Sequence, residues 1–233
     1  MERAVHRLFF TFIVALALPA QAARNVVSAA DDASEEQITR TLQDALSISA
    51  QAAIRRLGRE DGFVRNERVH IPLPDSLARA VSALRRVGMV RYPVELETNL
   101  NRAAEAAVPE LSVPFVDAIA HITFADARAA VRAGDETAAQ YFRRQTYSAM
   151  AIRFLPAVRA ATGRLRVADS YQQVAGRAAK VGLLRSDDAN LDDYITAKAL
   201  DAVYATMAEE EKAMRTDPMQ QTQKALRRVS GVR

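Results

Sequence analysis

The chain has 233 residues, of which 49% are hydrophobic and 26% charged, and its formal net charge is +4. Basic and acidic residues are interspersed, whereas a nucleic-acid-binding protein usually gathers its basic residues on one face, so the charge does not indicate nucleic-acid binding. There is no cysteine, which excludes disulfides, a lipid-attachment cysteine and thiol catalysis, and a chain of this length can bury enough apolar surface to fold without disulfides.

The first 22 residues have the pattern of a secretory signal peptide. Arg3 and Arg7 precede the apolar run LFFTFIVALAL, and Ala20 and Ala22 supply the small side chains of a cleavage site. The run is shorter than the about 20 apolar residues that a membrane span needs. We therefore predict cleavage after Ala22 and a periplasmic protein that has no transmembrane segment and a formal net charge of +3.

Residues 23–33 are expected to form a flexible leader, and helical periodicity begins at Ser34. Ser34 and Gln37 match the pattern of a capping box, and apolar residues then recur at helical spacing as far as Leu57. Because Gly58 is a natural helix end, the pattern predicts a first helix that stops there.

A long irregular segment follows, GREDGFVRNERVHIPLPD. Its Asp61-Gly62 pair and its two prolines disfavour helix, and Val69, Ile71 and Leu73 alternate with polar or proline positions. We expect an ordered connector over about residues 58–75.

Turn residues separate the helices that come next. Asp75 or Ser76 is expected to cap a helix that ends at Gly88. Pro93 suits the first turn of the following helix, which is interrupted near Pro109. A short helix then precedes the next cap.

In the second half of the chain the sequence predicts four helices, followed by a last helix at the C-terminal end. Thr123 with Asp126 caps one helix, and Asp135 caps a long helix that Pro156 kinks or ends. Pro218 starts the last helix. Two apolar stripes mark the helices in between: Tyr171, Val174, Ala178 and Val181, then Leu191, Ile195, Ala199, Val203 and Met207.

This pattern is that of an all-α protein. Neither an internal repeat nor a linker rich in serine, proline or glycine divides it. We predict a single multi-helix domain over residues 34–233 with one irregular connector.

Three polar residues, Glu97, Asn101 and Glu105, form a polar strip along the helix that follows Pro93. At about 100° per residue they lie at the edge of the apolar face, on the boundary between core and solvent. Arg102 is three residues before Glu105 and within ion-pair reach of it. Small alanine neighbours would let another helix come close enough for Asn101 and Glu105 to bond to it.

Three interpretations of the polar strip stay open. It could be a structural hydrogen-bond network between helices, the wall of a polar pocket, or a row of solvated charges. The structural network is the favoured interpretation.

Two further groups supply candidate site residues. Tyr141 and Arg144, at i and i+3, could present a phenol and a guanidinium together to a carboxylate or a phosphate. The competing and favoured interpretation is a core anchor and a surface charge. Asp201 lies near an apolar stripe, and Glu210 belongs to an acidic cluster that could bind a cation or simply be a solvated helix face.

The sequence predicts neither a metal site nor a cofactor. Asp117 and His121 are spaced i, i+4, but two ligands do not make a zinc site, and His70 is the other histidine after the signal segment. No glycine-rich phosphate loop, GxSxG or HExxH motif is present.

Four segments, in order, carry a resemblance: DGFVRNERVHIPLPDSL, NRAAEAAVPE, GDETAAQYFRRQT and ALDAVYATMAEEEKAMRTDP. They resemble the bacterial family catalogued as domain of unknown function 4197, from about residue 35 onward. The resemblance implies an exported helical protein and brings no activity with it. The motif residues that it carries over are Asn101, Arg102, Glu105, Tyr141, Phe142, Asp201, Glu210, Glu211 and Arg215.

Two functional hypotheses follow. The first is a non-enzymatic protein of the cell envelope that binds a protein partner or a small ligand through a polar-edged groove between helices. The second is a hydrolase-like or lyase-like enzyme with Glu105 as general acid or base and Arg102, Tyr141 or Arg144 stabilising charge. The second requires Glu105, Tyr141 and Arg144 to converge on one concave pocket.

Overall fold

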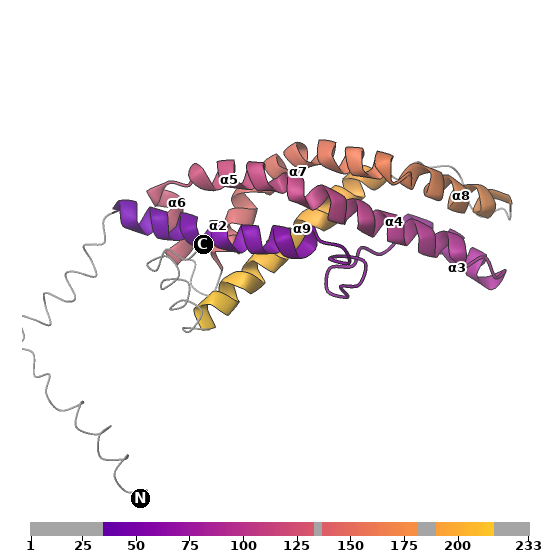
Figure 1. Cartoon of the computed structure of the whole chain (residues 1–233), viewed down its shortest axis with the longest axis horizontal. Coiled ribbons are helices and arrows are strands. Elements are labelled where there is room, and N and C mark those ends of the chain that lie inside the picture. The colour runs from indigo at the N-terminus through magenta and orange to yellow at the C-terminus, as the bar shows by residue number, and fades with distance from the viewer. Residues whose placement is uncertain (1–34, 133–136, 181–189, 217–233) are drawn as a thin grey trace, which may run out of the picture.

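Helices make up most of the chain in the computed structural model, which describes residues 35–132, 137–180 and 190–216 (Figure 1). No strand occurs within these ranges, so the predicted all-α class is confirmed. Over the same ranges, no helix combines the length and the apolar character that crossing a membrane requires. The α-helices are α2 (Glu35–Leu57), α3 (Ala78–Arg86), α4 (Arg91–Ala107), α5 (Ser112–Ala120), α6 (Phe124–Arg132), α7 (Ala138–Arg164), α8 (Val167–Lys180) and α9 (Leu191–Thr216), and the 3-10 turns η1 (Asp75–Leu77) and η2 (Val108–Leu111) precede α3 and α5.

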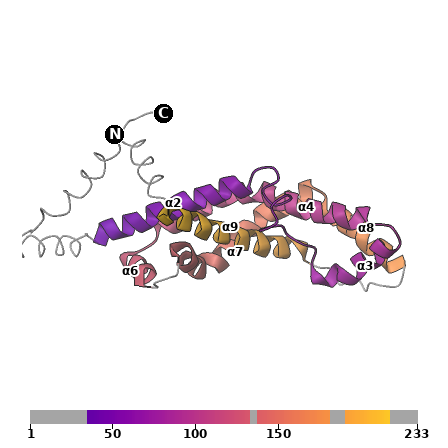
Figure 2. The same cartoon turned by 90° about the horizontal axis from the view of Figure 1, so that it is seen from below.

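The two longest helices, α7 and α9, pack against each other at the centre of the molecule. α2 packs across α9, and α4 packs on both α7 and α8 (Figures 1 and 2). The molecule is elongated, with α6 near one end and α3 and α8 at the other. The predicted stripe of α9 is confirmed as core, since its five apolar residues are buried.

An aromatic cluster joins three helices in the core. The ring centroid of Phe115 on α5 lies 5.8 Å from that of Phe142 on α7 and 5.4 Å from that of Tyr204 on α9. Phe142 and Tyr204 are 6.1 Å apart and tilted, which is a favourable arrangement of aromatic rings. These residues are far apart along the chain, so their ring contacts hold α5, α7 and α9 together in the core.

The connector occupies residues 58–74 and is ordered, as predicted. Phe63 and Ile71 are fully buried in the core. Backbone hydrogen bonds such as Gly62 N–H to the Arg59 carbonyl, at 3.0 Å, close its turns. A Cβ added at Gly62 would lie 2.3 Å from the Leu57 carbonyl oxygen, so this turn requires glycine.

Several predicted helix ends are confirmed. Gly88 has φ +77° after α3, a conformation that favours glycine. Thr123 caps α6: its hydroxyl accepts from Asp126 N–H at 3.3 Å, and the Asp126 carboxylate accepts from Thr123 N–H at 2.9 Å. Pro93 lies in the first turn of α4, and Pro109 falls in η2, where α4 has ended.

Other predicted helix boundaries were wrong. Neither Asp75 nor Ser76 caps α3 with its side chain, because they belong to the 3-10 turn η1 that leads into the helix. The long helix α7 is capped by Thr137, which exchanges hydrogen bonds with Gln140 in a capping box. Of the two outcomes predicted at Pro156, the helix end is wrong: Pro156 lies inside α7 on its exposed face, where the carbonyl that loses its N–H partner can bond to water.

Some predictions concern residues outside the described ranges. They are the signal segment with its cleavage site, the leader, the cap at Ser34, the cap at Asp135, Val181 of one stripe, and the helix predicted after Pro218.

Candidate functional site

Two residues of the polar strip of α4 are buried, and not at the boundary with solvent as predicted: Asn101 is 0% exposed and Glu105 is 5% exposed. Glu97 is half-buried, as predicted. The prediction was wrong for Asn101 and Glu105 because the connector folds over this side of α4, and nothing local in the helix reveals such a cover. The partner of the polar strip is therefore the connector backbone, where the sequence suggested a second helix.

Asn101 binds the connector as a neighbouring strand would. Its Oδ1 accepts from the Ile71 N–H at 2.8 Å, and its Nδ2 donates to the Ile71 carbonyl, also at 2.8 Å. The same Nδ2 donates to the Glu97 carbonyl at 2.8 Å. The Asn101 amide thus satisfies both buried backbone groups of Ile71, which have no ladder of their own.

Glu105 fixes the first turn of the connector. Its Oε1 accepts from the N–H groups of Phe63 and Val64, at 2.9 and 3.0 Å. Its Oε2 accepts from Arg102 at 2.7 Å, and Arg102 donates in turn to Asp61 at 2.7 Å. The hydrogen bond to Glu105 raises the pKa of Arg102 above its ordinary value. The Glu105 carboxylate is fully occupied by this structural network, so the favoured interpretation of the polar strip agrees with the geometry.

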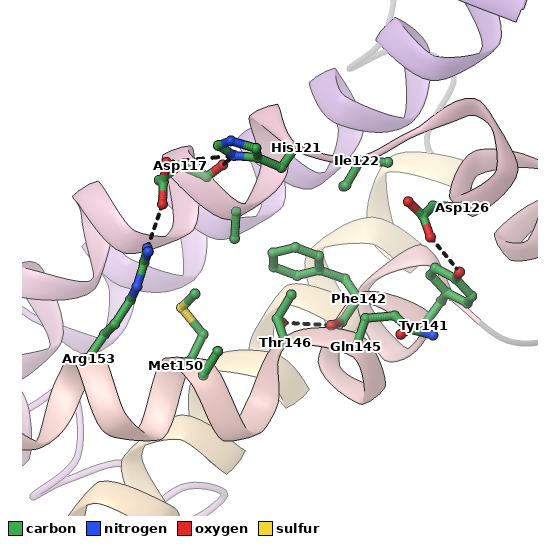
Figure 3. Close-up of a pocket in the computed structure, with 12 residues that line it drawn as sticks. Asp117, His121, Ile122, Asp126, Tyr141, Phe142, Gln145, Thr146, Met150 and Arg153 are labelled. Carbon is green, nitrogen blue, oxygen red and sulfur yellow. Dashed lines mark hydrogen bonds and ion pairs between the residues drawn. The ribbon is translucent and has the colours of Figure 1, made fainter.

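A pocket lies elsewhere, between α5, α6 and α7 (Figure 3). Its volume is about 410 Å³, within the range of small-molecule sites. Phe142 and Met150, both 2% exposed, lie along the middle of it. The complete lining is Asp117, Ala118, His121, Ile122, Asp126, Tyr141, Phe142, Gln145, Thr146, Ala149, Met150 and Arg153.

Polar pairs bound this pocket at its two ends. At one end Arg153 of α7 donates to Asp117 of α5 at 2.5 Å, and at the other the Tyr141 hydroxyl donates to Asp126 of α6 at 3.0 Å (Figure 3). His121 lies beside Asp117 on the solvent side, with its side chain 79% exposed.

The hydrogen bonds of these pairs shift the acidity of their members. The Arg153 guanidinium lowers the pKa of Asp117, and the Thr123 hydroxyl lowers the pKa of Asp126. Burial, together with the bond to Asp126, raises the pKa of Tyr141. At neutral pH the carboxyl groups of Asp117 and Asp126 are therefore ionised, and the phenol of Tyr141 is neutral.

Comparison with known proteins places the chain in a family. Residues 32–231 match the family described as Protein of unknown function (DUF4197). The chain belongs to that family. No curated protein and no solved structure matches it significantly. The resemblance seen in the four sequence segments is thereby confirmed.

The structure of this DUF4197 chain does not bring its predicted site residues together in one pocket. Tyr141 lines the pocket, but Glu105 and Arg144 do not. The Arg144 guanidinium lies over the Tyr141 ring, 5.5 Å from its centroid. Asp201 pairs with Arg143 at 2.7 Å on the surface. Glu210 is 3.4 Å from Arg56 in a contact between α9 and α2.

One residue of the DUF4197 motifs has a role that sequence reasoning missed. Glu211, the residue after Glu210 in the acidic cluster, is 4% exposed, and its two carboxylate oxygens accept from Ala138 N–H at 3.0 Å and Ala139 N–H at 2.9 Å. It therefore caps the N-terminus of α7 from α9. Across the described ranges of the chain, no three potential ligands cluster in a way that could hold a metal ion.

The pocket was also missed, although α7 carries a signal for it. Phe142, Thr146 and Met150 recur at i, i+4 and i+8, and Gln145, Ala149 and Arg153 repeat the spacing three residues later. The two rows run along adjacent sides of one helix. Asp117 was noted only as a poor metal ligand, whereas its partner is Arg153.

Proposed function

We propose that this DUF4197 protein is exported to the periplasm and acts there as a non-enzymatic binding protein for a small molecule with an apolar body and a hydrogen-bonding group. One observation carries the proposal: the pocket between α5, α6 and α7 has a buried apolar floor and a rim whose charged groups are already paired. Because its charged groups are already paired, the rim can orient a ligand through hydrogen bonds without requiring the ligand to be charged.

The chemistry of the lining supports this class of ligand. Phe142 and Met150 provide an apolar surface, and methionine adapts readily to different shapes. Gln145 and His121, both exposed at the rim, can donate and accept hydrogen bonds. A ligand would place its apolar part over the floor and its polar group among these rim side chains.

The acidity of the pocket supports binding over catalysis. A general acid or base works best with a pKa near the working pH. Asp117 and Asp126 have lowered pKa values and Tyr141 a raised one, so each is shifted away from neutrality. The competing hypothesis, an enzyme that uses Glu105, lacks support, because Glu105 is occupied by the connector and lines neither this pocket nor the hollow of similar volume near Tyr171.

A blocked pocket tests the binding proposal. Ala149 lines the pocket and is exposed, so Ala149→Trp should fill it without disturbing the core. Ser148→Trp, exposed on the same helix but outside the lining, is the matched control. The probe is N-phenyl-1-naphthylamine, an apolar dye with one N–H group whose fluorescence rises in apolar sites.

Dye fluorescence that rises with the wild type and Ser148→Trp but not with Ala149→Trp is the expected result. If no dye binds, or if Ala149→Trp binds it as well as the wild type, the pocket is not a binding site and the proposal fails.

Export is tested separately by the N-terminus of the protein recovered from a bacterial host. We expect a periplasmic protein that begins at Ala23, as the signal pattern predicts. A cytoplasmic protein that keeps residues 1–22 would contradict this part of the proposal.

A further inference from the structure

The junction between α3 and α4 exposes a group of apolar side chains that we name the apolar tip: Val87, Met89, Val90 and Val94. They are 57%, 43%, 45% and 50% exposed. Four of the seven large hydrophobic residues that are exposed in the described part of the chain thus fall within eight consecutive positions. Such clustering marks an interaction site more than scattered exposure does.

The apolar tip is held in place by its surroundings. The Met89 N–H donates to the Leu84 carbonyl at 2.8 Å, and Gly88 turns the chain with its positive φ. At the base of α4, the Arg177 guanidinium of α8 lies 3.6 Å from the centroid of the Tyr92 ring. The buried side chain of Leu84 anchors α3 beneath the tip. The exposed residues therefore sit on a preformed support.

The position of the apolar tip limits what it can meet. It lies where α3 turns into α4, at the end of the elongated molecule opposite α6 (Figures 1 and 2). A protruding end with four apolar side chains presents much less area than the about 800 Å² per partner of a specific protein interface. A bilayer surface, in contrast, accepts a small protruding apolar group.

The charges around the apolar tip are mostly positive. From residue 76 to residue 94 the chain contains four arginines and no acidic residue. Arg85, Arg86 and Arg91 are exposed and directly flank the tip. The nearest acidic side chain in sequence is Glu95, 3.8 Å from Arg91. Arginines placed just behind an apolar apex match the phosphates of a membrane surface.

We infer that the apolar tip inserts shallowly into an anionic phospholipid bilayer, with Arg85, Arg86 and Arg91 binding lipid phosphates. Apolar insertion and attraction to anionic lipid act together, as in peripheral membrane proteins that need two signals. This inference is independent of the pocket and does not require a ligand to be bound there.

Flotation of the purified protein with lipid vesicles tests the inference. Vesicles of phosphatidylcholine and phosphatidylglycerol in equal parts should bind the protein, at least about tenfold more tightly than vesicles of phosphatidylcholine alone. Added salt should weaken the binding, because it screens the arginines. If the anionic vesicles do not bind the protein, the inference is wrong.

Matched variants locate the binding surface. Met89→Asp with Val90→Asp should weaken vesicle binding at least about tenfold, and Arg85→Gln with Arg86→Gln should weaken it about fivefold per arginine. Val113→Asp with Val116→Asp changes two residues of α5 that are 77% and 57% exposed, and should leave vesicle binding unchanged. Circular dichroism confirms that each variant is folded.

Two results overturn the inference. One is vesicle binding that the tip variants leave intact, which would place the membrane contact elsewhere. The other is a tip that binds a protein from an envelope extract but no vesicle, which would make it a protein interface.

Discussion

Asn101 and Glu105 show how two side chains can order a segment that has no regular structure. The connector backbone is buried at Phe63 and Ile71, and each unsatisfied buried N–H or C=O group would cost about 1–3 kcal/mol. The amide of Asn101 and the carboxylate of Glu105 satisfy these groups from one face of α4. Both side chains are rigidly placed because α4 is itself packed against α7 and α8.

Glu105→Gln should destabilise the protein by about 1–3 kcal/mol, because it weakens the bonds to Phe63 and Val64 and removes the ionic partner of Arg102. In a protein of this size each kcal/mol lowers Tm by about 2–4 °C. Thermal unfolding measures the change. Glu110→Gln, an exposed residue of η2 just after the end of α4, is the control and should leave Tm unchanged. Equal Tm values for the wild type and Glu105→Gln would refute the structural role of this carboxylate.

The buried side chain of Tyr204 should make the folded protein less stable at alkaline pH. Burial raises the pKa of Tyr204 to about 12, and its hydroxyl bonds to Thr146 at 2.7 Å. The unfolded state releases this proton near its ordinary pKa of about 10. The stability that the raised pKa of Tyr204 gives to the folded state is therefore fully present below about pH 10 and is lost as the pH rises toward about 12.

Denaturant unfolding of the wild type and Tyr204→Phe, from neutral pH upward, checks this expectation. The wild type should lose stability more steeply than the variant above about pH 10. Parallel curves for the two proteins would show that Tyr204 ionises equally easily in the folded and unfolded states.

At the scale of elements, α7 depends on α9 for its N-terminus. The first N–H groups of a helix lack partners within it, and the helix dipole favours an anion there. Glu211 supplies both the acceptors and the charge for Ala138 and Ala139, while Thr137 and Gln140 form the capping box. The start of the longest helix is thus tied to the end of its main packing partner.

Glu211→Gln should lower the free energy of unfolding by about 1–2 kcal/mol, because the amide keeps one acceptor and loses the charge. Glu209→Gln changes an exposed neighbour that pairs with Arg56 and Arg68 at the surface, and should cost less than about 1 kcal/mol. Denaturant titration of both variants measures the difference. If the two substitutions lower the free energy of unfolding equally, the cap that Glu211 provides does not stabilise α7.

At the scale of the whole molecule, the two ends are unequally supported. The centre is held by α7, α9 and α2, and the aromatic cluster lies there. α3 packs mainly on α8 and η1 and buries only Ala80, Val81 and Leu84. The end that carries the apolar tip is therefore the more easily opened part of the described fold.

Hydrogen exchange followed by mass spectrometry checks this gradient. Amides of α3 should exchange at least about tenfold faster than those in the middle of α9, because they are protected by fewer buried contacts. Binding to anionic vesicles should slow exchange in α3 and leave α9 as it is. Protection of α3 equal to that of α9 would show that the molecule opens only as one unit.

The helices could be predicted because their causes are local. The apolar stripe of α9 repeats every four residues, Gly88 takes a positive φ in the turn that ends α3, and Thr123 meets Asp126 three residues away. Each signal acts over about one or two helical turns. The same reasoning did not single out Thr137 as the cap of α7, since several adjacent residues could serve there.

By itself, the sequence determined the all-α class, the order of helices, the ordered connector and the membership of the DUF4197 family. Only the tertiary structure decided that Glu105 meets the backbone of Phe63, that Glu211 meets α7, and that α5, α6 and α7 enclose a pocket. These contacts join residues that are distant along the chain. Local periodicity shows which face of a helix is apolar, but which element covers that face depends on how all the helices pack together.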